Sequence, residues 1–297
     1  MLSFLPGPLR ALFGFLLLMI NTLVWCTLLL FAALLKILIP LAPWQSFGAA
    51  CIHWMAGSWI ACNNMGLKLM YRIQWEVSGT KNLLKNRWYL VVCNHQSWVD
   101  IVVLQKIFHR KIPFLKFFLK KELIWIPVLG ITWWALGFPF MKRYSRSFLA
   151  KNPHLAGRDL AITRKACERY KQTPVSIMNF VEGTRFTPDK HARQSSPHAN
   201  LLRPKAGGVA FVLSAMEGRL NQVLDVTIVY PSGKKSFLDL LCGRIDRVRV
   251  NVELLPVDAA ILAGYFEDEA CRQPFHDWIN ALWDRKDKTF DDLISGT

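Results

Sequence analysis

Two short polar segments of this chain carry the residue types that proton transfer and anion binding require. The first, residues 94–100, reads NHQSWVD and places Asp100 five residues after His95. Residues five apart do not share a face of a continuous helix, so the two can meet only if His95 precedes a helix whose first turn holds Asp100. The carboxylate would then hold one ring nitrogen while the other faced a substrate, as in a general base. The alternative is a loop histidine and a first-turn acid that stabilises the helix start.

The second segment, residues 180–185, reads FVEGTR and places a carboxylate, a glycine and an arginine at the end of a strand-like run. Gly183 allows a tight turn at this point. The planar guanidinium of Arg185 suits a phosphate group. Glu182 has three open roles, since it could hold the arginine, cap a helix or bond a hydroxyl. The alternative for the whole segment is an ordinary Glu–Arg pair at a surface turn.

Further cations accompany these two segments in the sequence. Lys205 stands directly before Ala206-Gly207-Gly208, and glycines that open a helix favour an anion site. Residues 120–130 and 137–143 enclose apolar and aromatic side chains between cations that include Lys120 and Arg143. This composition suits a substrate with an apolar tail and an anionic head. Core packing with solvated basic ends is the alternative.

The apolar runs around these segments predict alternating strands and helices. Strands are expected at residues 73–78, 88–93, 138–141, 175–181, 223–230 and 248–255, and helices at 99–108, 158–171, 207–217 and 267–290. This pattern predicts an α/β domain with a central mixed, mostly buried sheet flanked by helices. His95 would follow the end of a strand, where ligand-binding residues of α/β proteins gather. Residues 187–204, rich in proline and serine, predict a loop that acts as an active-site flap.

The apolar N-terminal region predicts a membrane anchor at residues 1–70, followed by one domain at residues 71–297. Residues 11–35 carry no charge. At about 1.5 Å per residue they are long enough to cross a hydrocarbon core of about 30 Å. A second uncharged run, residues 37–67, contains several tryptophans, which favour the membrane interface. One span plus an interfacial helix and a two-helix hairpin both fit, whereas the apolar stretch is too long for a typical cleaved signal peptide.

The net charge of +16 and the cysteine usage both favour a cytoplasmic location for the polar part of the chain. Most of the excess positive charge lies between residues 101 and 205. A basic face beside an anchor attracts anionic headgroups, at about 1 kcal/mol per Lys or Arg. Positive-inside topology alone is the alternative explanation. The seven cysteines are odd in number and lack CxxC spacing, which predicts reduced thiols and no zinc site.

Several other chemistries have no motif in this sequence. There is no HExxH and no compact His/Asp/Glu cluster, which disfavours a catalytic metal. There is no GxSxG elbow, which disfavours a serine hydrolase, and no GxxxxGK[ST] phosphate loop. We therefore expect neither a metal nor a cofactor.

Taken together, the segments resemble the glycerolipid acyltransferase family of the lysophosphatidate acyltransferase (PlsC) type. That family is marked by NHxxxxD, a KxxLxxxPxxG block closing on an arginine, an FPEGTR block and a late apolar strand that ends in proline. The matching residues are Asn94, His95 and Asp100; Lys120, Leu123, Pro127, Gly130 and Arg143; Phe180, Glu182, Gly183, Thr184 and Arg185; and Val226–Pro231. Val181 stands where the family has proline, and residues 182–191 are similar to a branch that includes eukaryotic lysophospholipid and lysocardiolipin acyltransferases.

The resemblance implies a membrane-bound enzyme of the bacterial inner membrane, with its catalytic domain on the cytoplasmic side. It would move an acyl chain from acyl-CoA or acyl carrier protein to the hydroxyl of a lysophospholipid, most directly lysophosphatidate. His95, oriented by Asp100, would act as the general base. The residues implied in substrate binding are Glu182, Gly183, Thr184, Arg185, Arg143, Lys120 and Lys205. A thioester has a good leaving group, so no metal or covalent enzyme intermediate is required.

Two alternatives stay open. The acceptor could be another lysophospholipid or glycerol phosphate. The chain could instead be a non-catalytic, membrane-tethered module that binds anionic lipid or nucleic acid, which the basic residues between 101 and 205 favour. A binding module has no need of the His95 and Asp100 pair, and we expect no nucleic-acid partner.

Overall fold

The structure is a computed structural model, and it describes most of the chain. The described residues are 4–142, 144, 148, 151, 152, 154, 158–216, 218–220, 222–263 and 265–296. Arg143, which the sequence suggests as a substrate-binding residue, lies outside the described residues, as does Glu217 at the end of a predicted helix.

A six-stranded mixed sheet forms the centre of the molecule. Its strands are β1 (Gln74–Ser78), β2 (Tyr89–Cys93), β3 (Leu115–Phe117), β6 (Ser176–Phe180), β7 (Gln222–Val229) and β8 (Arg247–Pro256). Their spatial order is β1-β8-β7-β2-β6-β3. Every neighbouring pair is parallel except β7 and β8, which are antiparallel. All five residues of β2 are buried, as a strand near the middle of a sheet covered on both faces requires. The predicted mixed, buried sheet is confirmed.

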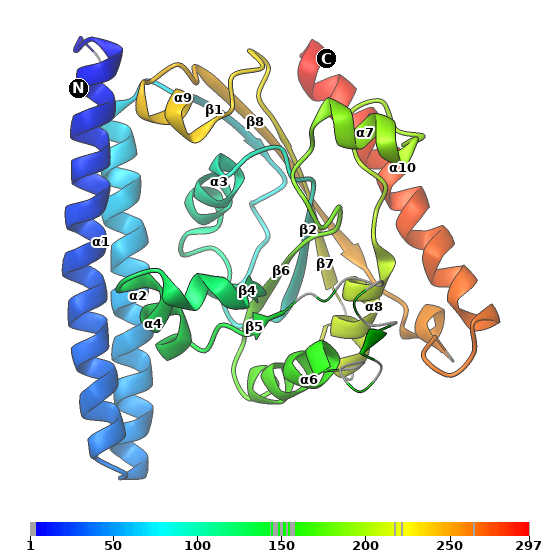
Figure 1. Ribbon diagram of the computed structural model, residues 1–297, viewed down its shortest axis with the longest axis horizontal. Helices are drawn as coiled ribbons and strands as arrows, with labels where there is room; N and C mark the ends of the chain where they lie inside the picture. The colour runs from blue at the N-terminus through cyan, green and yellow to red at the C-terminus, as the bar shows by residue number, and fades with distance from the viewer. Residues whose placement is uncertain are drawn as a thin grey trace.

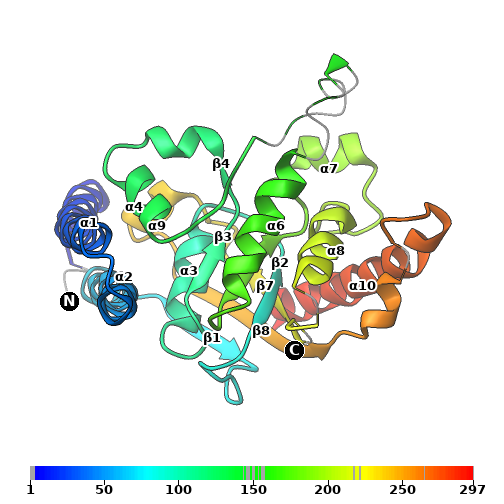
Figure 2. The same cartoon turned by 90° about the horizontal axis from the view of Figure 1, so that it is seen from below.

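Helices cover both faces of this sheet (Figures 1 and 2). On one face, α6 (Arg158–Tyr170), α8 (Ala206–Ala215) and α10 (Gln273–Ser295) pack over side chains such as Leu90 and Val92 of β2. On the other face, α3 (Val99–Phe108) and α9 (Phe237–Leu241) pack over Tyr89, Val91 and Cys93. The alternation of side chains along β2 thus supplies both cores from one short strand.

The N-terminal region forms two long antiparallel helices that lie side by side, α1 (Gly7–Leu38) and α2 (Ala42–Met70) (Figures 1 and 2). Asn21 Nδ2 donates to Asn63 Oδ1 at 2.7 Å between them. Buried side chains of α1 follow one stripe, Thr22, Cys26, Leu29 and Ala33, while most of its large apolar side chains are exposed. Of the described helices, α1 is long and apolar enough to cross a membrane. The number of membrane crossings stays a prediction.

Shorter elements depart from the predicted pattern. The expected strand at 138–141 reduces to β5 (Phe140–Met141), which pairs with β4 (Leu119–Lys120) in a separate two-stranded sheet. The 3₁₀ turn η1 (Lys121–Trp125) and helix α4 (Leu129–Ala135) lie between these strands. Neither β3 nor β4 was predicted, because two or three residues are too few to show a period.

The prediction of a loop over residues 187–204 is wrong for its first part, which forms α7 (Pro188–Gln194). The Thr187 side chain accepts a hydrogen bond from Lys190 N, and Pro188 occupies the first helical turn, where its missing N–H costs nothing. The rest of this segment is fastened to α10, since Asp287 accepts hydrogen bonds from Ala199 N at 2.7 Å and Asn200 N at 2.9 Å. Helix α10 itself starts later than predicted, after the 3₁₀ turns η3 (Ala259–Leu262) and η4 (Ala270–Arg272).

Candidate active site

The end of β2 is fixed to β7 through a buried asparagine. Asn94 directly follows β2 and is fully buried. Its Nδ2 donates to the carbonyl oxygen of Ile228 at 2.9 Å, and its Oδ1 accepts from Ile228 N at 2.9 Å. The amide side chain therefore continues the ladder between the two strands beyond the last backbone pair. These two hydrogen bonds fix the point at which the chain leaves the sheet, immediately before His95.

His95 and Asp100 meet as the spacing requires. His95 precedes α3, and Asp100 lies in the first turn of that helix. His95 Nδ1 lies 2.9 Å from Asp100 Oδ2. The imidazole is stacked on the Phe180 ring, with 3.8 Å between ring centroids. The side chain of Asp100 is 0% exposed and that of His95 12% exposed, so the carboxylate is shielded while the ring reaches solvent. With Nδ1 engaged, Nε2 is the nitrogen left to accept a proton.

Asp100 is held by several donors besides the histidine. Its Oδ2 also accepts from Gln96 N at 2.7 Å and from Ser97 N at 2.8 Å, and its Oδ1 accepts from Tyr230 Oη at 2.7 Å. These donors fix the position of the carboxylate. Burial and the nearby Asp100 charge raise the pKa of Tyr230 well above its usual range, so this phenol stays a donor.

Tyr230 was not predicted from the sequence as a residue of the site. It follows β7, far along the chain from Asp100, and enters the site only because β7 pairs with β2.

Glu182 connects the two polar segments and does not pair with Arg185 in the described residues. Its side chain is fully buried. Oε1 accepts from His95 N at 3.0 Å, and Oε2 accepts from Leu202 N at 3.3 Å. Burial raises the pKa of Glu182 to about 8, partly offset by these backbone hydrogen bonds. A further backbone bond from Phe186 N to His95 O, at 2.7 Å, joins the same segments.

The turn after β6 places Gly183 beside Lys205. Gly183 has a φ of +70°, which favours glycine, and a Cβ at this position would lie 3.1 Å from both Cδ and Nζ of Lys205. Lys205 N donates to Val181 O at 2.8 Å, which fixes the start of α8 next to this turn. The sequence-predicted Gly183 and Lys205 are thus brought together where β6 ends and α8 begins.

The remaining part of the turn presents Arg185 towards the His95 segment. The guanidinium carbon of Arg185 lies 4.7 Å from the centroid of the exposed Trp98 ring. Lys190 Nζ donates to Thr184 Oγ1 at 2.8 Å and to Arg185 O at 2.9 Å, so α7 holds the turn in place. Lys120 stands apart from this cluster, exposed at the end of β4 in the separate two-stranded sheet.

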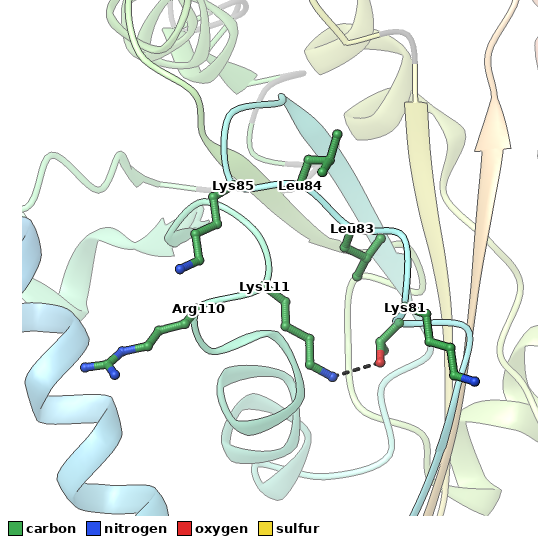
Figure 3. Close-up of a pocket in the computed structure, with 7 residues that line it drawn as sticks. Lys81, Leu83, Leu84, Lys85, Arg110 and Lys111 are labelled. Carbon is green, nitrogen blue, oxygen red and sulfur yellow. Dashed lines mark hydrogen bonds between the residues drawn. The ribbon is translucent and has the colours of Figure 1, made fainter.

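The site lies at the carboxyl ends of β2 and β6, whereas a cavity lies at the opposite, amino-terminal ends of the strands. That cavity, about 620 Å³, is lined by Thr80, Lys81, Leu83, Leu84, Lys85, Arg110 and Lys111, which precede β2 and β3 (Figure 3). Lys111 Nζ donates to Thr80 Oγ1 at 2.8 Å (Figure 3). The cavity is basic but remote from His95.

The candidate acid–base pair is His95 and Asp100. No group of three or more His, Cys, Asp or Glu side chains in the described ranges is placed to hold a metal ion. All seven cysteines lie within those ranges and are free thiols. The arrangement can take a proton at His95 Nε2, and it presents the cations of Arg185 and Lys205 nearby.

Several known acyltransferases are similar in sequence to this chain. The chain is 24% identical over 262 residues to a probable 1-acyl-sn-glycerol-3-phosphate acyltransferase 5 of Arabidopsis thaliana, covering 84% of this chain and 64% of the relative. It is 26% identical over 211 residues to the human 1-acyl-sn-glycerol-3-phosphate acyltransferase gamma, covering 67% and 51%. A 2-acyl-1-lysophosphatidylinositol acyltransferase of Saccharomyces cerevisiae is 24% identical, covering 67% and 59%. The chain thus spans about half to two thirds of the length of these relatives.

A solved structure shares the fold. It is the 1-acyl-sn-glycerophosphate (LPA) acyltransferase PlsC from Thermotoga maritima, with a TM-score of 0.59 and 18% identity, covering 97% of this chain and 95% of that one. The Acyltransferase family model matches residues 74–231, which run from β1 to the residue after Tyr230 and contain both polar segments. Since this match covers more than half of the sequence, the chain belongs to the Acyltransferase family.

Proposed function

We propose that this chain is a membrane-bound enzyme that transfers an acyl group from a thioester to the free hydroxyl of a lysophospholipid, most directly lysophosphatidate. The observation that carries the proposal is the 2.9 Å contact between His95 Nδ1 and the buried Asp100. Family membership and the names of the relatives support the reaction class. The donor is acyl-CoA or acyl carrier protein, and no metal or other cofactor takes part.

In the proposed mechanism His95 is the general base. Asp100 keeps the Nδ1–H tautomer, so the lone pair of Nε2 accepts the proton of the acceptor hydroxyl. The hydroxyl oxygen then attacks the thioester carbonyl and forms a tetrahedral intermediate. When this intermediate collapses, the C–S bond breaks, and the departing thiolate takes the proton from His95. Ester and thiol are the products, and the enzyme returns to its starting state.

We assign the substrate's charged group to the basic side of the site. Arg185 and Lys205 lie on the turn after β6 and at the start of α8. Thr184 and Gly183 shape that turn, and buried Glu182 positions His95 through its backbone N–H. Lys120 and Arg143 stay weaker candidates, the first because it lies on the separate two-stranded sheet.

The exposed apolar side chains of α1 support membrane association. We place the catalytic domain on the cytoplasmic side of a bacterial inner membrane, in agreement with the excess of basic residues between 101 and 205. There the acyl acceptor would be reached from the bilayer itself.

The acceptor is the least constrained part of the proposal. The S. cerevisiae relative is named for lysophosphatidylinositol, so a lysophospholipid other than lysophosphatidate is the second candidate acceptor. The decisive experiment is acyl transfer by purified, detergent-solubilised protein from labelled acyl-CoA to a panel of lysophospholipids and glycerol phosphate. The wild type and His95→Ala are compared.

We expect one acceptor to be esterified, and His95→Ala to lose at least about a hundredfold in turnover while it stays folded and membrane-bound. Near-normal turnover in His95→Ala would remove His95 from the mechanism. If acyl-CoA and acyl carrier protein both give no product with any acceptor, a membrane-tethered binding module becomes the better description of the chain.

A further inference from the structure

Lys235 reaches the active site from a loop outside the matched family region, which ends at residue 231. The loop connects β7 to α9. Lys235 Nζ donates to Gln96 Oε1, and its backbone oxygen accepts from Ser97 Oγ. The same Nζ lies 5.5 Å from the centroid of the Phe186 ring. Lys235 therefore touches the residues that follow His95 and the residue that follows Arg185.

The charge of Lys235 is half-buried and has no carboxylate partner. None of the ion pairs among the described residues includes Lys235; its polar contact is the neutral amide of Gln96. Asp100 and Glu182 act on it electrostatically, but their oxygens are occupied by other donors. Burial lowers the pKa of Lys235. A partly desolvated cation that forms no ion pair is costly, and binding an anion from outside the chain would offset this cost.

A second cation at the site, the exposed Arg185, also lacks a carboxylate partner among the described residues. The guanidinium of Arg185 lies against the Trp98 ring, and no carboxylate pairs with it in the part of the chain that the structure describes. Because Arg185 and Phe186 are neighbours, and Lys235 lies over Phe186, the two cations flank one short turn. Two cations without carboxylate partners beside one turn, one on the turn and one on the neighbouring β7–α9 loop, match a phosphate group, which carries more than one charge and several acceptor oxygens.

We propose that Lys235 is a substrate-binding residue that, together with Arg185, holds a phosphate group next to His95. This inference rests on the proposed function, because it requires a phosphate-bearing substrate. Two substrates supply that chemistry. One is the lysophospholipid acceptor, and the other is the phosphate-containing part of the acyl donor.

Four substrates separate these two sources. Lysophosphatidate and monoacylglycerol differ by the acceptor phosphate, and acyl-CoA and a simple acyl-pantetheine thioester differ by the donor phosphates. Three variants accompany the wild type. Lys235→Met removes the charge but keeps an apolar stem against Phe186, Lys235→Arg keeps the charge, and Lys234→Met removes the exposed cation next to it as the matched control.

We expect Lys235→Met to raise the KM for the phosphate-bearing substrate about tenfold or more, as loss of a charge-assisted hydrogen bond implies, with kcat within about threefold of wild type. Lys235→Arg should retain most of the affinity, and Lys234→Met should match the wild type. A rise for lysophosphatidate but not monoacylglycerol assigns the acceptor phosphate. A rise for acyl-CoA but not acyl-pantetheine assigns the donor.

An equal loss with phosphorylated and unphosphorylated substrates would overturn the inference. So would a fall in kcat without a change in KM. Either result would mean that Lys235 only fastens Gln96. If the wild type itself shows no acyl transfer, the proposed function fails separately, and stabilisation against heat by inorganic phosphate or lysophosphatidate tests Lys235 instead. The inference then requires that Lys235→Met lose this stabilisation, and an unchanged shift would reject it.

Discussion

The proposed role of His95 as a general base depends on how firmly Asp100 is held. Tyr230 is its one side-chain donor besides His95 among the described residues, with 2.7 Å between Tyr230 Oη and Asp100 Oδ1. We expect Tyr230→Phe to lower kcat about fivefold to tenfold, with KM nearly unchanged. This ratio corresponds to the net free energy of about one hydrogen bond. The measurement is steady-state kinetics with the preferred acceptor.

Tyr89→Phe is the matched control for this variant. Tyr89 is equally buried, but its hydroxyl accepts from Leu84 N near the opposite edge of the sheet. It should lose stability without losing turnover relative to folded protein. A wild-type kcat in Tyr230→Phe would mean that the backbone N–H groups of Gln96 and Ser97 suffice to orient Asp100.

Glu182 predicts a pH dependence of stability. Its pKa is raised by burial from an ordinary 4.5 to about 8, so between these values the folded chain binds a proton that the unfolded chain has released. The contribution of this group is therefore fully present below about pH 4.5 and is lost as the pH rises through 8. We expect the urea midpoint of the detergent-solubilised wild type to fall more steeply across this window than that of Glu182→Gln.

Glu182→Gln is expected to be less stable at low pH. Its NH₂ group cannot accept from the backbone N–H of either His95 or Leu202, so one buried donor loses its partner. Parallel pH profiles for the two proteins would show that Glu182 does not take up a proton on folding. Burial lowers the pKa of Lys116 to about 7, so its contribution makes stability rise with pH above this value. This contribution is the same in both proteins and does not affect their comparison.

At the scale of elements, the sequence predicts what local pattern encodes. Helix α3 begins and ends as predicted, because its apolar residues repeat with the helical period and Asp100 lies in its first turn. Strand β3 was not predicted because it has only three residues, with a lysine in the middle. That lysine, Lys116, is buried, and its Nζ lies 5.2 Å from the Phe138 ring centroid. A local sequence pattern does not predict such a tertiary contact.

The same distinction applies to the site. His95 and Asp100 are five residues apart, so their meeting depends on one helix start and could be predicted. Tyr230 and Lys235 arrive through the pairing of β7 with β2 and through the loop that follows β7. Their positions follow from sheet order, which the sequence left undetermined.

The docking of α10 on the sheet rests on a buried charge pair. Lys286 of α10 forms an ion pair with Asp225 of β7, and its Nζ also donates to Val226 O at 2.7 Å. Removing one partner leaves the other charge buried and uncompensated. We expect Lys286→Met to lower the free energy of unfolding by about 3–5 kcal/mol, measured by urea unfolding in detergent.

The double variant Asp225→Asn with Lys286→Met should recover part of this loss, because no buried charge remains. Lys288→Met, an exposed lysine on the same helix, is the control and should stay close to wild type. If Lys286→Met and Lys288→Met are equally stable, α10 is held by its apolar contacts alone, such as those of Phe275 and Trp283.

At the scale of the whole molecule, the exposed apolar surface continues from the N-terminal helices onto the domain that contains the six-stranded sheet. Helix α4 lies beside α1 and α2 in both views (Figures 1 and 2). Its Trp133 packs against the apolar cluster that contains Leu29 and Ala56 of those helices. Its outer side exposes Ile131 and Trp134, and the preceding η1 exposes 82% of Trp125. Exposed Lys120 and Lys121 come directly before this surface, as suits an anionic bilayer.

We expect α4 and η1 to touch the bilayer together with the N-terminal helices, because exposed tryptophans flanked by lysines favour the interface. The measurement is labelling by photoactivatable phospholipids in anionic vesicles, mapped by mass spectrometry. Label should appear on α1, α2, η1 and α4. Helix α10, on the far side of the molecule, should stay unlabelled (Figure 1).

The same expectation can be tested by comparing KM values for acceptor in vesicles and in detergent. Trp125→Ser should raise the KM for acceptor embedded in vesicles while leaving the KM for detergent-dispersed acceptor unchanged, because only the first substrate requires the surface to meet a bilayer. Ile294→Ser, which removes an exposed apolar side chain at the far end of α10, should change neither value. Label confined to α1 and α2 would show that the catalytic domain stands away from the membrane. The acceptor would then have to leave the bilayer to reach His95.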